Sequence, residues 1–177
     1  FPNVTLVGVI AADISLNLPD FRATERTYQL LSQVAGRAGR GNKRGEVVIQ
    51  TFFPENSAIQ TAARHGYVDL YQETLKERSA VRYPPFVKLI NVIFTGESSS
   101  AVTELSRDVA DNLRLFPGLE VIGPANCALE RLQNRWRRHL LIKCEPGTDL
   151  EPIREVTQEL QTKEVQILVD VDPYHLM

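Results

Sequence analysis

A nearly continuous apolar run close to the first residue restricts the fold of this 177-residue chain more than any other feature. Residues 4–10, Val-Thr-Leu-Val-Gly-Val-Ile, are rich in β-branched side chains and lie between Pro2 and Asp13. A strand buried on both faces of a parallel sheet has this pattern, whereas a strand with one solvent-facing side alternates apolar with polar residues. The run therefore predicts an α/β fold.

An amphipathic helix is predicted over about residues 22–38, because its apolar residues recur at helical spacing. These residues are Leu31, Val34, Ala35 and Ala38. Gly39 and Gly41 are expected to end the helix, since glycine readily adopts the left-handed geometry of a helix stop. A second buried strand is expected over residues 46–53, and strand, helix and strand together make one α/β unit.

Two adjacent prolines, Pro84 and Pro85, mark the predicted domain boundary, because both stiffen the chain and neither carries a backbone donor. The boundary separates a domain of residues 1–83 from one of residues 84–177. The second domain is predicted to have the order β-α-β-β-α-β, which is typical of a split βαβ-like, ferredoxin-like fold. Its elements are expected at residues 87–94, 99–116, 119–122, 128–132 with 136–143, 150–160 and 165–171.

The net charge of −2 conceals two basic windows. Residues 20–45 carry a net charge of +4 and residues 131–143 one of +5, so the remaining residues carry −11. Arginine clusters favour phosphate-bearing partners, because the planar guanidinium donates two parallel hydrogen bonds to phosphate oxygens. The alternative is that each cluster is a solvated surface.

Composition excludes several classes of protein. The 43% of apolar residues and the two cysteines fit neither a disordered chain nor a disulfide scaffold, and no apolar stretch approaches the roughly 20 residues of a membrane helix. Cys127 and Cys144 are expected to be buried thiols in a reducing compartment, and no metal site is predicted. Because the chain begins at Phe1, we expect it to be a piece of a longer protein.

The sharpest motif is residues 33–41, Gln-Val-Ala-Gly-Arg-Ala-Gly-Arg-Gly, at the end of the first predicted helix. Its small residues allow a ligand to approach closely, and Arg37 and Arg40 project from one side of the helix end because they lie three residues apart. Two guanidiniums there can hold a polyphosphate. The structural alternative is a helix that ends at glycine and carries two surface arginines.

These nine residues resemble the sixth motif of superfamily 2 helicases, and residues 1–7 resemble the end of their fifth motif. Shorter stretches extend the likeness over the whole chain to the primosomal replication-restart helicases. They are residues 20–26, Tyr83-Pro84-Pro85-Phe86, Gly123-Pro124-Ala125 and Asp170-Val171-Asp172-Pro173.

The resemblance implies that the first domain is the C-terminal part of the second RecA-like motor lobe. It implies that Arg40 is the arginine finger on the γ-phosphate of ATP and that Arg37 is a second catalytic phosphate contact. Gln33 and Gly36 complete the implied ATP-binding set. The Gly-rich phosphate loop and the carboxylates for Mg²⁺ belong by resemblance to the first lobe, and no such loop or Asp-Glu pair occurs in this sequence. The chain alone is therefore expected not to hydrolyse ATP, and the family's zinc module is expected upstream.

A DNA-binding role is predicted for two groups of residues. Arg22 and Arg26 face DNA or couple it to the nucleotide site, unless Asp20 caps the helix and both are surface charges. In the second group, arginines track phosphates and an exposed tryptophan stacks on a base. The alternative for the second group is that Trp136 points into the core. Strand alternation does not decide between the two, because it only places Arg135 and Arg137 on one face of the strand and Trp136 and Arg138 on the other. The second group is Arg131, Arg135, Trp136, Arg137 and Arg138.

The resemblance further implies an ATP-dependent 3′-to-5′ DNA helicase that restarts stalled replication forks in the bacterial cytoplasm, near the nucleoid. Its implied partners are forked and single-stranded DNA, single-stranded DNA-binding protein and other primosome proteins, with no membrane. The alternative function is a non-catalytic module for nucleic-acid binding or primosome assembly, in which the same arginines contact phosphate backbones only.

Overall fold

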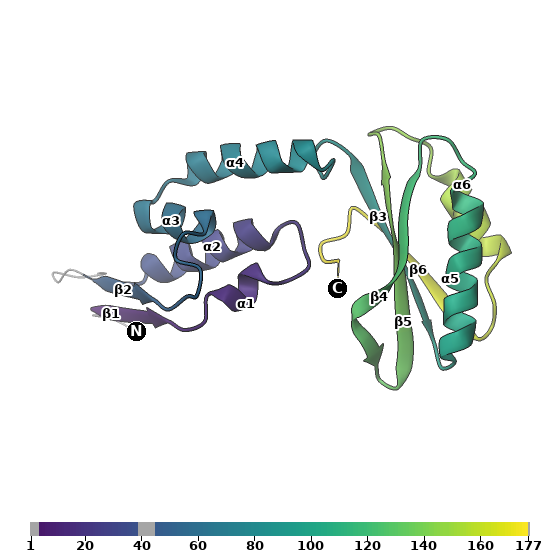
Figure 1. Cartoon of the computed structure of the whole chain (residues 1–177), viewed down its shortest axis with the longest axis horizontal. Helices are drawn as coiled ribbons and strands as arrows, with labels where there is room; N and C mark the ends of the chain where they lie inside the picture. The colour runs from purple at the N-terminus through teal and green to yellow at the C-terminus, as the bar shows by residue number, and fades with distance from the viewer. Residues whose placement is uncertain (1–3, 39–44, 177) are drawn as a thin grey trace. The chain divides into compact units, whose positions relative to one another are not determined.

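The computed structural model describes residues 4–38 and 45–176, which form two compact units divided between Ala80 and Val81 (Figure 1). The sequence places its boundary a few residues later, at Pro84-Pro85. Each unit has its own cluster of buried apolar side chains. Among the described residues, no helix combines the length and apolar character that a membrane crossing requires.

The first unit contains a parallel strand pair, β1 (Leu6–Val9) and β2 (Glu46–Ile49), in register from Leu6↔Glu46 to Val9↔Ile49. Its helices are α1 (Asp13–Leu16), α2 (Ala23–Ala35), α3 (Ser57–Arg64) and α4 (Tyr67–Ala80). Leu31 of α2 packs with Ile59 and Ala62 of α3 and with the inner side chains Val9 and Ile49 of the strands. The predicted strand-helix-strand unit is therefore confirmed.

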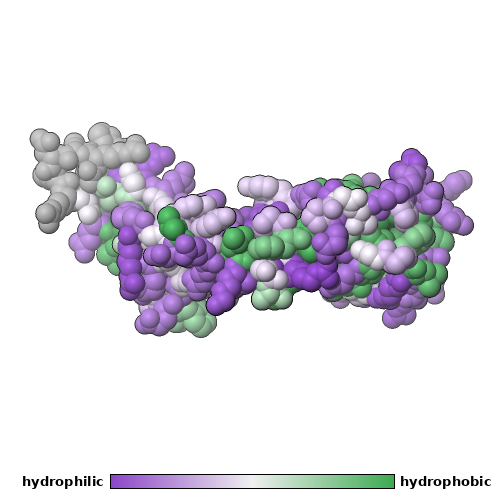
Figure 2. All heavy atoms as spheres, turned by 90° about the horizontal axis from the view of Figure 1, so that it is seen from above, coloured by the Kyte–Doolittle hydropathy of each residue, from purple (hydrophilic) through white to green (hydrophobic). Residues whose placement is uncertain are grey.

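The prediction that the first strand is buried on both faces is wrong for this chain. Leu6 is 61% exposed and Val48 is 52% exposed, while alternate residues face the core. Within the described residues this sheet has two strands, and α2 packs on one of its faces. The other face thus exposes apolar side chains. Figure 2, a view of the whole molecule from above, shows that apolar side chains are interspersed with hydrophilic ones on that side of the surface.

Helix α2 ends at Ala35, earlier than the predicted Ala38. Its last carbonyls are satisfied by a tightened turn, in which Arg37 N–H donates to Val34 O and Ala38 N–H donates to Ala35 O. Gly39 and Gly41, the predicted stop, lie outside the described residues. Helix α1 was not predicted, because four residues are too short to show a helical period.

The second unit has the predicted order β-α-β-β-α-β, with antiparallel neighbours in the sheet order β4-β5-β3-β6. Two interleaved βαβ units give this order, because each crossover leaves room for a strand of the other. Both helices cover one face of the sheet (Figure 1). The elements are β3 (Lys88–Gly96), α5 (Ser99–Leu113), β4 (Glu120–Leu132), β5 (Arg135–Cys144), α6 (Glu151–Glu159) and β6 (Val165–Val171).

Strand β4 runs over 13 residues, where two shorter segments were predicted. It stays continuous because irregularities after Ile122 and after Asn126 absorb the changes of register with β5. Gly123 has φ 103°, and a Cβ there would lie 3.1 Å from His139 O, so glycine suits this position. The predicted turn is confirmed at Gln133 and Asn134, whose φ values of 49° and 66° fit a tight hairpin.

The sheet face away from the helices carries a polar pair of a buried asparagine and a half-buried histidine. His139 Nδ1–H donates to Oδ1 of the buried Asn91 over 3.1 Å. Burial lowers the pKa of His139, and the charge of Arg137 lowers it further. Both cysteines are free and buried, as predicted, and burial raises the pKa of each thiol.

The depressed pKa of His139 predicts a pH-dependent stability. At His139 the unfolded chain binds a proton at a higher pH than the folded chain does. The contribution of His139 to the free energy of unfolding is therefore fully present above pH about 6.5 and decreases as the pH falls toward the folded pKa. His139→Gln should remove this component, because glutamine still donates to Asn91 but does not titrate. Urea unfolding at several pH values measures it, with the exposed His175→Gln as the control. Identical pH dependence in His139→Gln and the unsubstituted chain would contradict the prediction.

Candidate nucleotide and nucleic-acid contacts

The end of α2 presents three of the four predicted ATP-binding residues. Gln33, Gly36 and Arg37 are exposed and, being separated by three and four residues, lie along one side of the helix end. Leu31 on the opposite side is buried in the core. Packing of Leu31 therefore turns the polar side outward. Arg40, the fourth residue, lies outside the described residues.

A cavity of about 320 Å³ lies beside this helix end. Its lining is largely apolar and comes from α2, β2 and α3, including Ala35, Val47 and Ala62. Neither Gln33, Gly36 nor Arg37 lines it. The predicted phosphate contacts are thus on an open surface and not in this cavity.

Asp20 organises the first turn of α2. Its buried carboxylate accepts hydrogen bonds from Arg22 N–H and from Arg26 Nη1, both at 2.9 Å. Helix α2 starts after Arg22 without a side-chain cap, so the predicted capping by Asp20 is wrong; Asp20 instead holds the turn before the helix and fixes Arg26, whose side chain is 22% exposed.

The neighbouring charges contribute to packing within the first unit. Glu25 pairs with Arg78 of α4 at 2.8 Å. The guanidiniums of Arg22 and Arg78 lie 4.2 and 4.8 Å from the ring centre of Phe21. Arg22 and Arg26 are thus positioned by contacts of the unit itself.

The β4–β5 hairpin carries the second predicted group, and Trp136 on it is partly buried against the core of the second unit. The Arg131 guanidinium lies 5.2 Å from the centre of the Trp136 ring, and Arg131 Nη2 donates to Asn134 Oδ1 at 2.5 Å. The Trp136 ring therefore points toward the core, as the structural alternative predicts, and the Arg131 guanidinium lies at one face of the ring.

Arg138 lies on the same side of the strand as Trp136. Its Nη1 donates to Thr103 Oγ1 of α5 at 3.1 Å, and its Nη2 donates to Pro124 O at 3.2 Å. Because these bonds join β5 to α5 and β4, Arg138 stabilises the unit.

Arg135 and Arg137 occupy the other side by alternation. Arg135 Nη2 makes one long bond of 3.5 Å to Thr95 O. Burial raises the pKa of Cys127 and lowers that of His139, and the charge of the nearby Arg137 opposes the first shift and adds to the second. These two arginines are half-buried and bring positive charge to the hairpin.

Two further features were not predicted. The buried Asp13 accepts hydrogen bonds from Thr51 Oγ1 at 2.5 Å and Phe52 N–H at 2.9 Å, which lower the pKa of its carboxyl and tie α1 to the end of β2. A cavity of about 580 Å³ in the second unit contains none of the predicted residues. No group of three or more His, Cys, Asp or Glu side chains in the described ranges is arranged to hold a metal ion.

Comparison with known proteins gives one family and several relatives. The model of the family described as "Primosomal protein N C-terminal domain" matches residues 79–174. The replication restart protein PriA of Bacillus subtilis is 37% identical over 184 residues, which cover 100% of this chain and 23% of that protein. The PriA of Synechocystis is 37% identical over 96% of this chain and 21% of its own length, and that of Haemophilus influenzae is 36% identical over 99% and 25%. The chain spans about a quarter of the length of these relatives.

Proposed function

The chain belongs to the family of primosomal protein N C-terminal domains, and from this membership we propose that it forms the C-terminal part of a replication restart protein. The whole protein is proposed to be an ATP-dependent 3′-to-5′ DNA helicase that restarts stalled forks and takes part in primosome assembly. Its proposed partners are forked and single-stranded DNA, single-stranded DNA-binding protein and other primosome proteins.

The first unit is proposed to be part of the second RecA-like motor lobe. In support, β1 and β2 are parallel, and their outer face exposes Leu6 and Val48. Parallel sheets are normally covered on both faces. An apolar face open to solvent in an isolated parallel pair is therefore consistent with a sheet that other parts of a motor protein extend and cover.

The observation that carries the ATP proposal is the outward line of Gln33, Gly36 and Arg37 at the end of α2. These residues fit a polyphosphate, because Gly36 has no side chain to obstruct its approach and Arg37 is exposed without an acidic residue in the motif. Arg37 is the proposed second phosphate contact, Gln33 a polar link to the nucleotide, and Arg40 the arginine finger. Mg²⁺ is assigned to the first lobe, outside this chain.

An arginine finger acts on the charge that develops on the transferred phosphoryl group in the transition state. In the whole protein, Arg40→Ala should lower DNA-stimulated ATP hydrolysis by a factor on the order of a thousand, while fork binding is nearly unchanged. Steady-state phosphate release and fork-binding anisotropy measure the two effects. Arg64→Ala, on the exposed end of α3, is the matched control. Undiminished ATP hydrolysis in Arg40→Ala would exclude the finger assignment.

The second unit is proposed to bind DNA through the β4–β5 hairpin, because residues 131–143 hold five basic residues and no acid. Within the hairpin the side chains differ in their contacts with the rest of the unit. Arg138 bonds to Thr103 and Pro124, and Trp136 packs on the core. Arg135 and Arg137 are therefore the proposed phosphate contacts, with Arg131 beside the ring of Trp136.

Removing two phosphate contacts should weaken the salt dependence of binding. For Arg135→Ala with Arg137→Ala, the slope of log K against log salt concentration should fall by about two, because each neutralised phosphate contributes roughly 0.9. Fork-binding titrations at several salt concentrations measure the slope. The control is Arg107→Ala with Lys163→Ala, which removes the same charge from exposed positions elsewhere in the unit. Equal slopes for both double variants would show that the hairpin does not contact phosphates.

A further inference from the structure

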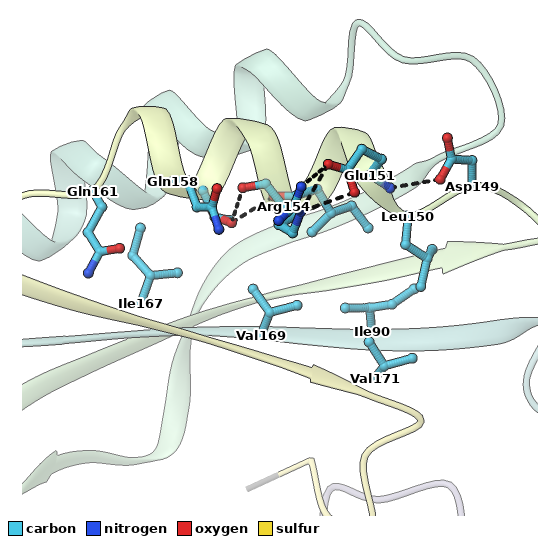
Figure 3. Close-up of a pocket in the computed structure, with 12 residues that line it drawn as sticks. Ile90, Asp149, Leu150, Glu151, Arg154, Gln158, Gln161, Ile167, Val169 and Val171 are labelled. Carbon is cyan, nitrogen blue, oxygen red and sulfur yellow. Dashed lines mark hydrogen bonds and ion pairs between the residues drawn. The ribbon is translucent and has the colours of Figure 1, made fainter.

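A groove of about 580 Å³ lies between α6 and the edge strand β6 (Figure 3). Its floor is apolar and comes from Ile90 of β3 and from Ile167, Val169 and Val171 of β6. Leu150 and Ile153 add apolar side chains from the α6 side. Polar side chains follow α6 along the rim, and they are Asp149, Glu151, Arg154, Gln158 and Gln161.

The floor of the groove is incompletely covered by the unit itself. Val169 is 36% exposed and Val171 is 42% exposed, although both side chains lie on the helix side of β6. Strand β6 pairs with β3 on one side, and no described strand pairs with its other side. An edge strand with free backbone groups beside an apolar groove is the arrangement that accepts an added strand.

The surroundings of the groove are acidic. Residues 145–172 contain eight Asp and Glu against two Lys and Arg, a net charge of −6. Arg154, the basic residue on the rim, donates from Nε to both carboxylate oxygens of Glu151 and from Nη2 to one of them. Both groups are ionised at neutral pH, and the hydrogen bonds to Glu151 raise the pKa of Arg154 further. The lining itself holds two carboxylates, Asp149 and Glu151, against the one guanidinium of Arg154, so a phosphate backbone or an acidic peptide would meet a net negative charge here.

We propose that this groove binds an extended, cationic and apolar segment of a partner protein, which pairs with the outer edge of β6. Alternate side chains of a strand point to opposite faces. Apolar side chains of the added strand would lie over Ile167, Val169 and Val171, and its basic side chains would lie on the opposite face of the sheet, beside Asp170 of β6. The inference does not depend on ATP or DNA binding by the chain.

Three labelled seven-residue peptides test the inference by fluorescence anisotropy with the whole 177-residue chain. They alternate Lys with Val, Glu with Val, and Lys with Ser. The Lys-Val peptide should bind about tenfold or more tightly than either other peptide, because it alone combines complementary charge with apolar side chains. A Glu-Val peptide that binds as tightly would overturn the charge argument, and an equal Lys-Ser peptide would overturn the role of the groove. No binding by any of the three would overturn the proposal.

Two matched substitutions locate the peptide. Val169→Lys places a cation in the groove and should weaken Lys-Val binding about tenfold or more, whereas Leu129→Lys, at an exposed position of β4 at the other end of the sheet order, should change it less than about twofold. Thermal unfolding shows whether each variant is folded, and Val171→Lys, at a more exposed floor position, replaces Val169→Lys if it is not. Equal losses in both variants would contradict the placement. Sedimentation equilibrium completes the test, because a dimer that Val169→Lys dissociates would identify a second copy of the chain as the occupant and refute the proposed partner.

Discussion

The central antiparallel pairing of β3 with β5 is the interaction on which the second unit depends. It runs from Lys88↔Cys144 to Gly96↔Trp136, and one face of the two strands supplies much of the buried apolar cluster beneath α5 and α6. Because β5 continues into the turn at Gln133 and Asn134, the same ladder fixes the hairpin arginines. Because β6 pairs with the other side of β3, it also fixes the floor of the groove.

This arrangement separates charge between the two ends of the sheet order. Strand β4 and its hairpin partner β5 carry the basic window of residues 131–143, while α6 and β6 belong to the acidic segment of residues 145–172. Polyanions are attracted to the first and repelled by the second. The near-neutral net charge of −2 is thus compatible with a proposed phosphate-binding surface and a proposed protein-binding surface on one small unit.

The helices and strands that could be predicted from the sequence are those with a strong local pattern of apolar residues. Helix α5 was predicted with its buried residues because Val102, Leu105, Val109 and Leu113 repeat at helical spacing, and β6 was predicted with its exact bounds. Interactions between distant residues were not predictable, because no spacing encodes them. Examples are Arg138 with Thr103, Glu25 with Arg78, and the groove, which requires the placement of α6 over β6.

The candidate sites show the same division. Helical spacing placed Arg37 and Arg40 on one side of the helix end, of which the structure describes Arg37, whereas alternation placed Trp136 and Arg138 together but could not tell which face was buried. The most direct test of the account is a map of backbone amide NMR shifts in the chain on titration with a forked oligonucleotide at low salt. The account predicts shifts centred on residues 131–138, with α6 and β6 little changed. Shifts centred on α6 and β6 would contradict it.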